Sequence, residues 1–85
     1  MHHSARKHGL TDTTIEHAIV NSLVTVDLDP DSDPPRVLAI GPDHGGNLLE
    51  VIWLEFADGV DVVIHAMPLR PVFRDLLPKP GGEAI

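Results

Sequence analysis

The sequence predicts an α+β domain in which an antiparallel sheet leads into a short C-terminal helix. Three observations predict this class: an amphipathic helical repeat near the N-terminus, apolar strand-like runs separated by turn residues, and a proline-led apolar repeat near the C-terminus. The chain has 85 residues, which suffices for one domain and leaves no room for a second core. We expect the domain to occupy residues 1–78 and a flexible tail to follow over residues 79–85.

The N-terminal part predicts two short helices. Residues 2–8 would form the first, and Gly9 would end it, because glycine favours the left-handed conformation that closes many helices. Thr11 or Thr13 would cap the second helix, and Thr13 and Glu16 have the spacing of a capping box. Apolar residues then recur at helical spacing and predict one buried stripe, made of Ile15, Ala18, Ile19 and Leu23.

The middle of the chain predicts an antiparallel meander of three or four strands. The predicted strands are residues 24–28, 36–40, 48–56 and 60–66. An acidic, proline-rich loop separates the first two, and Asp58-Gly59 is a hairpin turn signal between the last two. Strict alternation along the last strand would place Asp61, Val63 and His65 on the same face.

A short helix is predicted after the sheet. Pro68 suits the first turn of a helix, because that position needs no N–H donor. The apolar residues that follow have the spacing to dock this helix on the sheet, and they are Leu69, Val72, Phe73, Leu76 and Leu77.

Composition excludes several classes of protein. The chain has no cysteine, so disulfides and zinc–thiolate sites are excluded, and it has no apolar stretch long enough to cross a membrane. Without a recognisable signal peptide, we expect a cytoplasmic protein. The six histidines are scattered, so we expect neither a metal site nor a cofactor. The net charge of −7 repels phosphate backbones, so nucleic-acid binding would need a local basic patch.

The candidate site for chemistry is a set of three residues, His65, Arg70 and Arg74. The two arginines are four apart and would share a face of an α-helix, while His65 lies near the end of the preceding strand. A histidine can move protons and arginines can stabilise phosphorane charge, which is sufficient for RNA cleavage without metal. In the alternative interpretation the arginines pair with acids such as Asp61 or Asp75, and His65 is a half-buried sheet residue.

Two glutamates on the long strand are a weaker candidate. Glu50 and Glu55 are five residues apart, so they point to opposite faces of the sheet and cannot act as a carboxylate pair. We expect them to be solvated or ion-paired.

A family resemblance adds to this interpretation. The run Arg6-Lys7-His8-Gly9-Leu10 before an amphipathic helix, and the later strand Val63-Ile64-His65-Ala66 leading into a C-terminal helix, resemble the BrnT-type toxins over residues 5–77. Those proteins belong with the RelE-like toxins, which are compact α+β ribonucleases neutralised by an antitoxin. The chain departs from the family in its acidic charge and at Met67, where the family has an arginine.

The resemblance implies a toxin-like RNA endonuclease, or a descendant of one. His65 would be its acid or base, Arg70 and Arg74 would stabilise charge, and Arg6 and Lys7 would position RNA or the ribosome. The expected partner is a cognate antitoxin or another basic protein.

The alternative is a non-catalytic interaction module, either a homodimer or the acidic partner of a basic protein. Its contact surface would be Trp53 and the long strand, which carries apolar residues on both faces. DNA binding through residues 2–23 is a poorer hypothesis, because the second helix carries Asp12 and Glu16 and neither lysine nor arginine.

Overall fold

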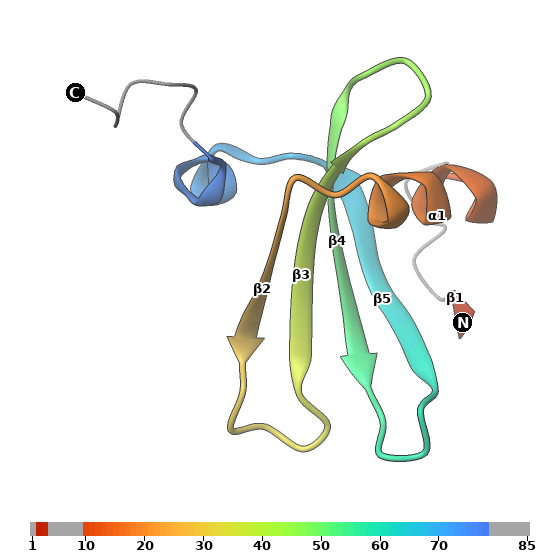
Figure 1. The fold of residues 1–85 in the computed structure, drawn as a ribbon, viewed down its shortest axis with the longest axis vertical. Coiled ribbons are helices and arrows are strands. Elements are labelled where there is room, and N and C mark those ends of the chain that lie inside the picture. Colours follow the sequence, from red (N-terminus) through yellow and green to blue (C-terminus); the bar gives the residue numbers. More distant parts are fainter. Residues whose placement is uncertain (1, 4–9, 79–85) are drawn as a thin grey trace.

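The computed structural model describes residues 2–3 and 10–78 of the chain, which form an α+β fold. Five strands make one sheet, with a helix before it in the chain and a short 3-10 helix after it (Figure 1). The elements, in order, are β1 (His2–His3), α1 (Asp12–Val20), β2 (Val24–Asp29), β3 (Arg36–Pro42), β4 (Leu48–Glu55), β5 (Asp61–Pro68) and η2 (Pro71–Leu76).

The predicted meander is confirmed. Strands β2, β3, β4 and β5 are neighbours in chain order and pair antiparallel. The prediction of a helix over residues 2–8 is wrong at its start, because His2 and His3 form β1 and pair in parallel with Val62 and Val63 of β5. The rest of that predicted helix and Gly9 lie outside the described residues.

Helix α1 begins at a threonine cap. Thr11 is in the extended conformation and its hydroxyl accepts a hydrogen bond from the Thr14 backbone N–H at 3.2 Å, so the capping box expected from Thr13 is not the one used. Ile15 and Ala18 are fully buried, as the apolar stripe predicts. Leu23 lies beyond the end of the helix and is 54% exposed, so the stripe is shorter than expected.

Close packing of α1 on the sheet requires a glycine in β3. A Cβ atom added to Gly41 would collide with the backbone carbonyl of Ala18. The absence of a side chain therefore lets the end of α1 lie directly against the strand.

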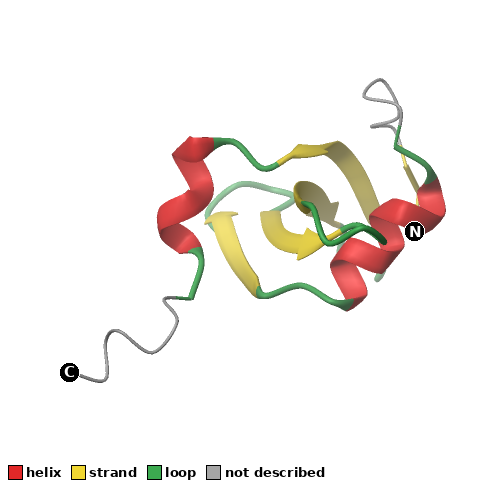
Figure 2. Ribbon diagram, turned by 90° about the horizontal axis from the view of Figure 1, so that it is seen from above, coloured by secondary structure: helices red, strands yellow, loops and turns green. Residues whose placement is uncertain are grey.

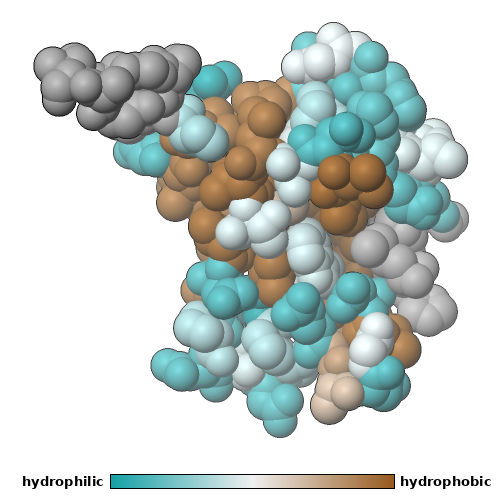
Figure 3. Space-filling view, viewed as in Figure 1, coloured by the Kyte–Doolittle hydropathy of each residue, from teal (hydrophilic) through white to brown (hydrophobic). Residues whose placement is uncertain are grey.

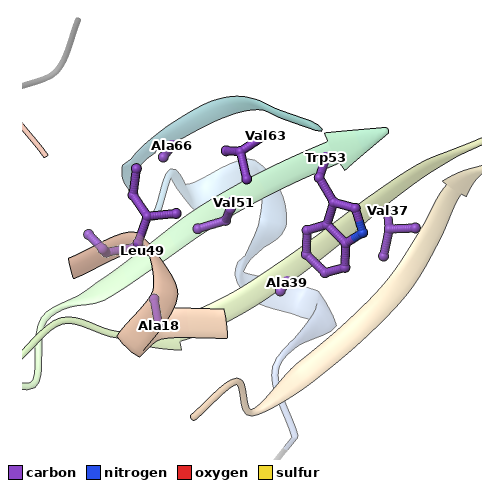
Figure 4. Close-up of a cluster of buried hydrophobic side chains, with 9 residues drawn as sticks. Ala18, Val37, Ala39, Leu49, Val51, Trp53, Val63 and Ala66 are labelled. Carbon is purple, nitrogen blue, oxygen red and sulfur yellow. The ribbon is translucent and has the colours of Figure 1, made fainter. Parts of the chain in front are cut away.

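The hydrophobic core lies between α1 and one face of the sheet. Its buried members are Ile15, Ala18, Val37, Ala39, Leu49, Val51, Trp53, Val63 and Ala66. Trp53 extends from β4 beside Val37 and Ala39 of β3 (Figure 4). Only 7% of Trp53 is exposed, so it serves this core and is not available as the contact surface of an interaction module.

A β-bulge in β5 changes which residues share a face. Val63 pairs with Trp53, whereas His65 pairs with Ile52, so Ile64 is an extra residue without a partner. Val63 therefore points into the core while His65 points to the opposite face. The expectation from strict alternation that these two residues lie together is wrong.

The C-terminal helix is shorter and more exposed than predicted. It is a 3-10 helix, Pro71–Leu76, with no buried residue. It lies on the side of the sheet opposite α1 (Figure 2). Val72 is 71% exposed and Leu76 is 39% exposed, so these two of the apolar residues predicted to pack on the sheet lie largely in solvent. Hydrophobic residues consequently reach the surface beside this helix (Figure 3).

The helices of the described residues are short. None of them combines the length and the hydropathy that a membrane-spanning helix needs.

Candidate functional site

A buried carboxylate organises the face of the sheet that α1 does not cover. Glu50 lies in β4 between two core residues, Leu49 and Val51, so its own side chain points to the opposite face. There it pairs with Ile40 of β3 and Met67 of β5, near the end of the sheet where β4 begins. The side chain of Glu50 has no exposed surface. A buried charge of this kind needs partners.

Two residues, His65 and Arg70, supply those partners. Nε2 of His65 lies 2.7 Å from Oε2 of Glu50. Arg70 donates from Nη2 to the same oxygen at 2.7 Å and from Nε to both oxygens at 3.0 and 3.2 Å. The backbone N–H of Arg70 donates to Oε1 at 2.8 Å. Both carboxylate oxygens are therefore saturated with donors, and Glu50 itself cannot touch a substrate.

The β-bulge brings His65 to this carboxylate. Because Ile64 is the extra residue in β5, His65 faces the same side of the sheet as Glu50. An ionised carboxylate only accepts hydrogen bonds, so the Nε2 atom of His65 must carry the proton in their contact. The histidine side chain is 22% exposed and thus reaches solvent at one edge.

Arg70 joins the C-terminal segment to the sheet. It precedes η2 in an extended conformation, and the neighbouring Leu69 N–H donates to the carbonyl of Leu48 at 3.0 Å. Its guanidinium also lies 5.5 Å from the centre of the Phe73 ring, within the range of a cation–π contact. The Arg70 side chain is 47% exposed, so it is held by Glu50 while one side remains at the surface.

The contacts within the cluster favour the ionised forms of Glu50 and Arg70. Burial tends to raise the pKa of Glu50, but hydrogen bonds from the Arg70 side chain, the Arg70 backbone and His65 together hold that pKa below its ordinary value. The same contact with Glu50 raises the pKa of Arg70. Glu50 is thus a carboxylate, and Arg70 a cation, throughout the neutral range.

The structure brings together two of the five residues predicted to form a site. His65 and Arg70 meet through Glu50. Arg74 lies in the last turn of η2, and its side chain makes no hydrogen bond or ion pair with another described residue. The expectation that Arg70 and Arg74 share a helical face is wrong, because Arg70 precedes a 3-10 helix with three residues per turn. Arg6 and Lys7 lie outside the described residues.

Glu50 is the residue that sequence reasoning missed. It was expected to be a solvated or ion-paired glutamate on the face opposite to Glu55, and it is indeed ion-paired and on that other face. Its importance was signalled by its place within the otherwise apolar run Leu48-Leu49-Glu50-Val51-Ile52 of a central strand. A charge there is either buried with partners or destabilising.

Many of the acidic residues lie at one end of the sheet. The loops of both hairpins, β2–β3 and β4–β5, lie together at the end of the sheet far from η2 (Figure 1). Seven acids lie at or near this end, namely Asp27, Asp29, Asp31, Asp33, Glu55, Asp58 and Asp61. Arg36 is the one arginine or lysine among the described residues there. Arg70 and Arg74 are at the other end, together with Glu50 and Asp75.

Two further histidines, His17 and His44, lie close together. The rings of His17 and His44 are 4.1 Å apart, tilted by 32°. Within residues 2–3 and 10–78, however, no group of three or more His, Asp or Glu side chains is placed to hold a metal ion.

Comparisons with known proteins add nothing to this geometry. The chain matches no protein-family model, and searches of curated proteins and of solved structures found no significant match.

Proposed function

We propose that the chain is a RelE-like toxin, a metal-independent RNA endonuclease in which His65 and Arg70 perform the chemistry. The observation that carries this proposal is the shared carboxylate. Glu50 holds an imidazole and a guanidinium side by side, and both remain partly exposed, at 22% and 47% of their side chains. Clusters of coupled charged groups with restricted solvation are typical of catalytic sites.

The proposed reaction is attack of a ribose 2′-oxygen on the adjacent phosphorus. The bond from phosphorus to the 5′-oxygen breaks, a proton leaves the 2′-hydroxyl, and a proton reaches the departing 5′-oxygen. His65, whose Nε2 atom contacts Glu50, would serve as the acid or base. Arg70 would stabilise the charge on the phosphorane oxygens through Nη1, the guanidinium nitrogen that does not bond Glu50.

The seven acids at the hairpin end are remote from the candidate site, which lessens their repulsion of an RNA substrate although the net charge is −7. The acidic hairpin loops are remote from Arg70, so a phosphate approaching the C-terminal end avoids the repulsion of those loops. Arg74 would add positive charge to this approach. Under this proposal the protein's partner is a cognate antitoxin, and the acidic end suits a basic one.

An RNA cleavage assay in the presence of EDTA tests the proposal. We expect the wild-type protein to cleave RNA, alone or on ribosomes, and the His65→Gln variant to be slower by about 100-fold or more. His44→Gln is the matched control, because His44 lies in an exposed turn and its ring contacts His17 of α1, and it should cleave like the wild type. Equal rates for the two variants, or no cleavage by folded wild-type protein under either condition, would overturn the proposal.

A second candidate function is that of a non-catalytic interaction module. It is favoured by the acidic end of the sheet and by hydrophobic residues at the surface, including Leu28 at 37% exposure and Phe56 at 40%. A basic protein is the partner that this charge fits best. A homodimer is less suited, since pairing two β2 edges would bring Asp27 and Asp29 of both copies together.

Sedimentation velocity distinguishes these two modes of association. A monomer at micromolar concentrations excludes the homodimer. Co-sedimentation with a basic partner that is lost on adding salt would support the acidic-partner interpretation. If folded wild-type protein cleaves no RNA but binds such a partner, the second candidate replaces the first.

A further inference from the structure

We infer that Glu50 is a positioning residue, which holds the His65 ring in the Nε2–H tautomer and orients the guanidinium of Arg70. The inference rests on the proposed function for its consequence in catalysis, but the positioning itself is a property of the folded chain. Glu50 was not a predicted site residue, and its complete burial prevents direct contact with RNA. It can act only through the two residues that it binds.

The first part of the inference concerns the proton on His65. The two ring nitrogens of a neutral histidine exchange roles, and the partner of one nitrogen decides which tautomer predominates. Glu50 offers only acceptor oxygens, at 2.7 Å from Nε2. The contact with Glu50 therefore keeps the proton on Nε2.

The second part concerns the orientation of Arg70. Nε and Nη2 form one side of the planar guanidinium, and both donate to Glu50. The Arg70 backbone N–H donates to the same carboxylate, which fixes the main chain as well as the side chain. The third nitrogen, Nη1, is then directed away from Glu50. Because Glu50 binds the Nε and Nη2 side of the Arg70 guanidinium, the Nη1 side is the one that can bind an anion.

The cluster also makes the site depend on the docked C-terminal segment. Glu50 and His65 come from adjacent strands, whereas Arg70 comes from the segment that follows β5. Without Glu50 there is no buried charge to hold that segment at the sheet. The same residue therefore assembles the site and aligns its two members.

The test begins with the wild-type protein and uses nitrogen-15 NMR of the histidine rings. At a pH where His65 is neutral, we expect its spectrum to show the proton on Nε2. The signal is assigned by its loss in the His65→Gln variant. A predominant Nδ1–H tautomer in the wild type would overturn the inference, whether or not the protein cleaves RNA and whether or not any variant folds.

The Glu50→Gln variant then tests the link to catalysis. A glutamine amide can donate to Nε2, so we expect the His65 tautomer to shift towards Nδ1–H. We also expect kcat for RNA cleavage to fall by about 100-fold or more, with a much smaller change in KM, as when the orienting carboxylate of a catalytic histidine is replaced by an amide. Glu55→Gln, on the same strand but exposed, should leave both readouts unchanged.

The outcomes separate the two proposals. Folded Glu50→Gln protein with an altered tautomer and unaltered kcat would contradict the catalytic part of the inference. Wild-type protein with the predicted tautomer but without cleavage would contradict the proposed function alone.

Discussion

The Oε2 atom of Glu50 accepts a hydrogen bond from Nη2 of Arg70 at 2.7 Å, although the two residues are 20 positions apart and the glutamate is fully buried. This contact joins the central strand of the sheet to the segment that precedes η2. It also explains how a charged side chain is tolerated inside the small apolar sheet. The stability of the domain and the geometry of the candidate site therefore depend on the same carboxylate.

Replacing Glu50 with glutamine should destabilise the protein. The variant loses the charge that strengthens the hydrogen bonds from His65 and Arg70, and we expect the free energy of unfolding to fall by about 2 kcal/mol. Urea unfolding followed by the fluorescence of Trp53, the only tryptophan, measures the change. The exposed control Glu55→Gln should change the free energy by less than about 0.5 kcal/mol. Equal effects of the two substitutions would contradict the structural role of Glu50.

The contribution of Glu50 to the stability of the folded protein should decrease in acid. Its pKa in the folded protein lies below the ordinary value of 4.5, so the unfolded chain takes up the proton first as pH falls. The contribution of ionised Glu50 to the free energy of unfolding is fully present above about pH 4.5, and it is lost as the pH falls through the lowered pKa of Glu50.

We therefore expect the gap in unfolding free energy between the wild type and Glu50→Gln to narrow below about pH 4.5. Urea titrations at several pH values from 7 downwards measure it. Asp43, whose pKa is also lowered, chiefly by the backbone N–H of Asn47, is present in both proteins and cancels in the comparison. A gap that widens in acid would contradict the assignment of Glu50 as the ionised partner.

The two arginines near the C-terminus should differ in their contribution to stability. Arg70→Met removes the guanidinium that pairs with buried Glu50, whereas Arg74→Met changes a residue without a partner among the described residues. We expect the urea midpoint to fall for Arg70→Met and to remain close to that of the wild type for Arg74→Met. A larger fall for Arg74→Met would mean that η2 is held at the sheet by contacts other than the Glu50 cluster.

Gly41→Ala tests the close contact between α1 and β3. The added Cβ would meet the backbone carbonyl of Ala18, and backbone atoms cannot rotate away as a flexible side chain does. The helix must shift, and we expect a loss of more than about 1 kcal/mol in unfolding free energy. Gly45→Ala is the matched control, since its Cβ would have no neighbour closer than 3.4 Å. A stability equal to that of the control would show that α1 does not lie against the strand in solution.

The strands and α1 were predictable because their signals are local. Alternation, the Asp58-Gly59 turn and the prolines of the acidic loop define β2 to β5, and the spacing of Ile15 and Ala18 defines the buried face of α1. The pairing of β1 with β5 was not predictable, because two histidines carry no strand signal and their partners are about 60 positions away.

The candidate site was only half predictable for a similar reason. His65 and Arg70 stand out as chemical groups near a strand end, but their meeting depends on the extra residue Ile64, which moves His65 to the face of Glu50. A bulge of this kind leaves no sure mark in a single sequence, since Ile64 is an ordinary strand residue. The error in assigning the face of His65 thus follows from the bulge, whereas the burial of Glu50 was signalled by its apolar neighbours in β4.

The products of cleavage test the central claim most directly. A short RNA and the same RNA with a single 2′-deoxy sugar at the cleaved position are incubated with the wild-type protein in EDTA. We expect the first to yield fragments with a 2′,3′-cyclic phosphate and a free 5′-hydroxyl, and the second to remain intact at that position. Cleavage of the deoxy-substituted strand at the same rate, or fragments carrying a 5′-phosphate, would contradict a reaction in which His65 and Arg70 promote attack by the 2′-oxygen.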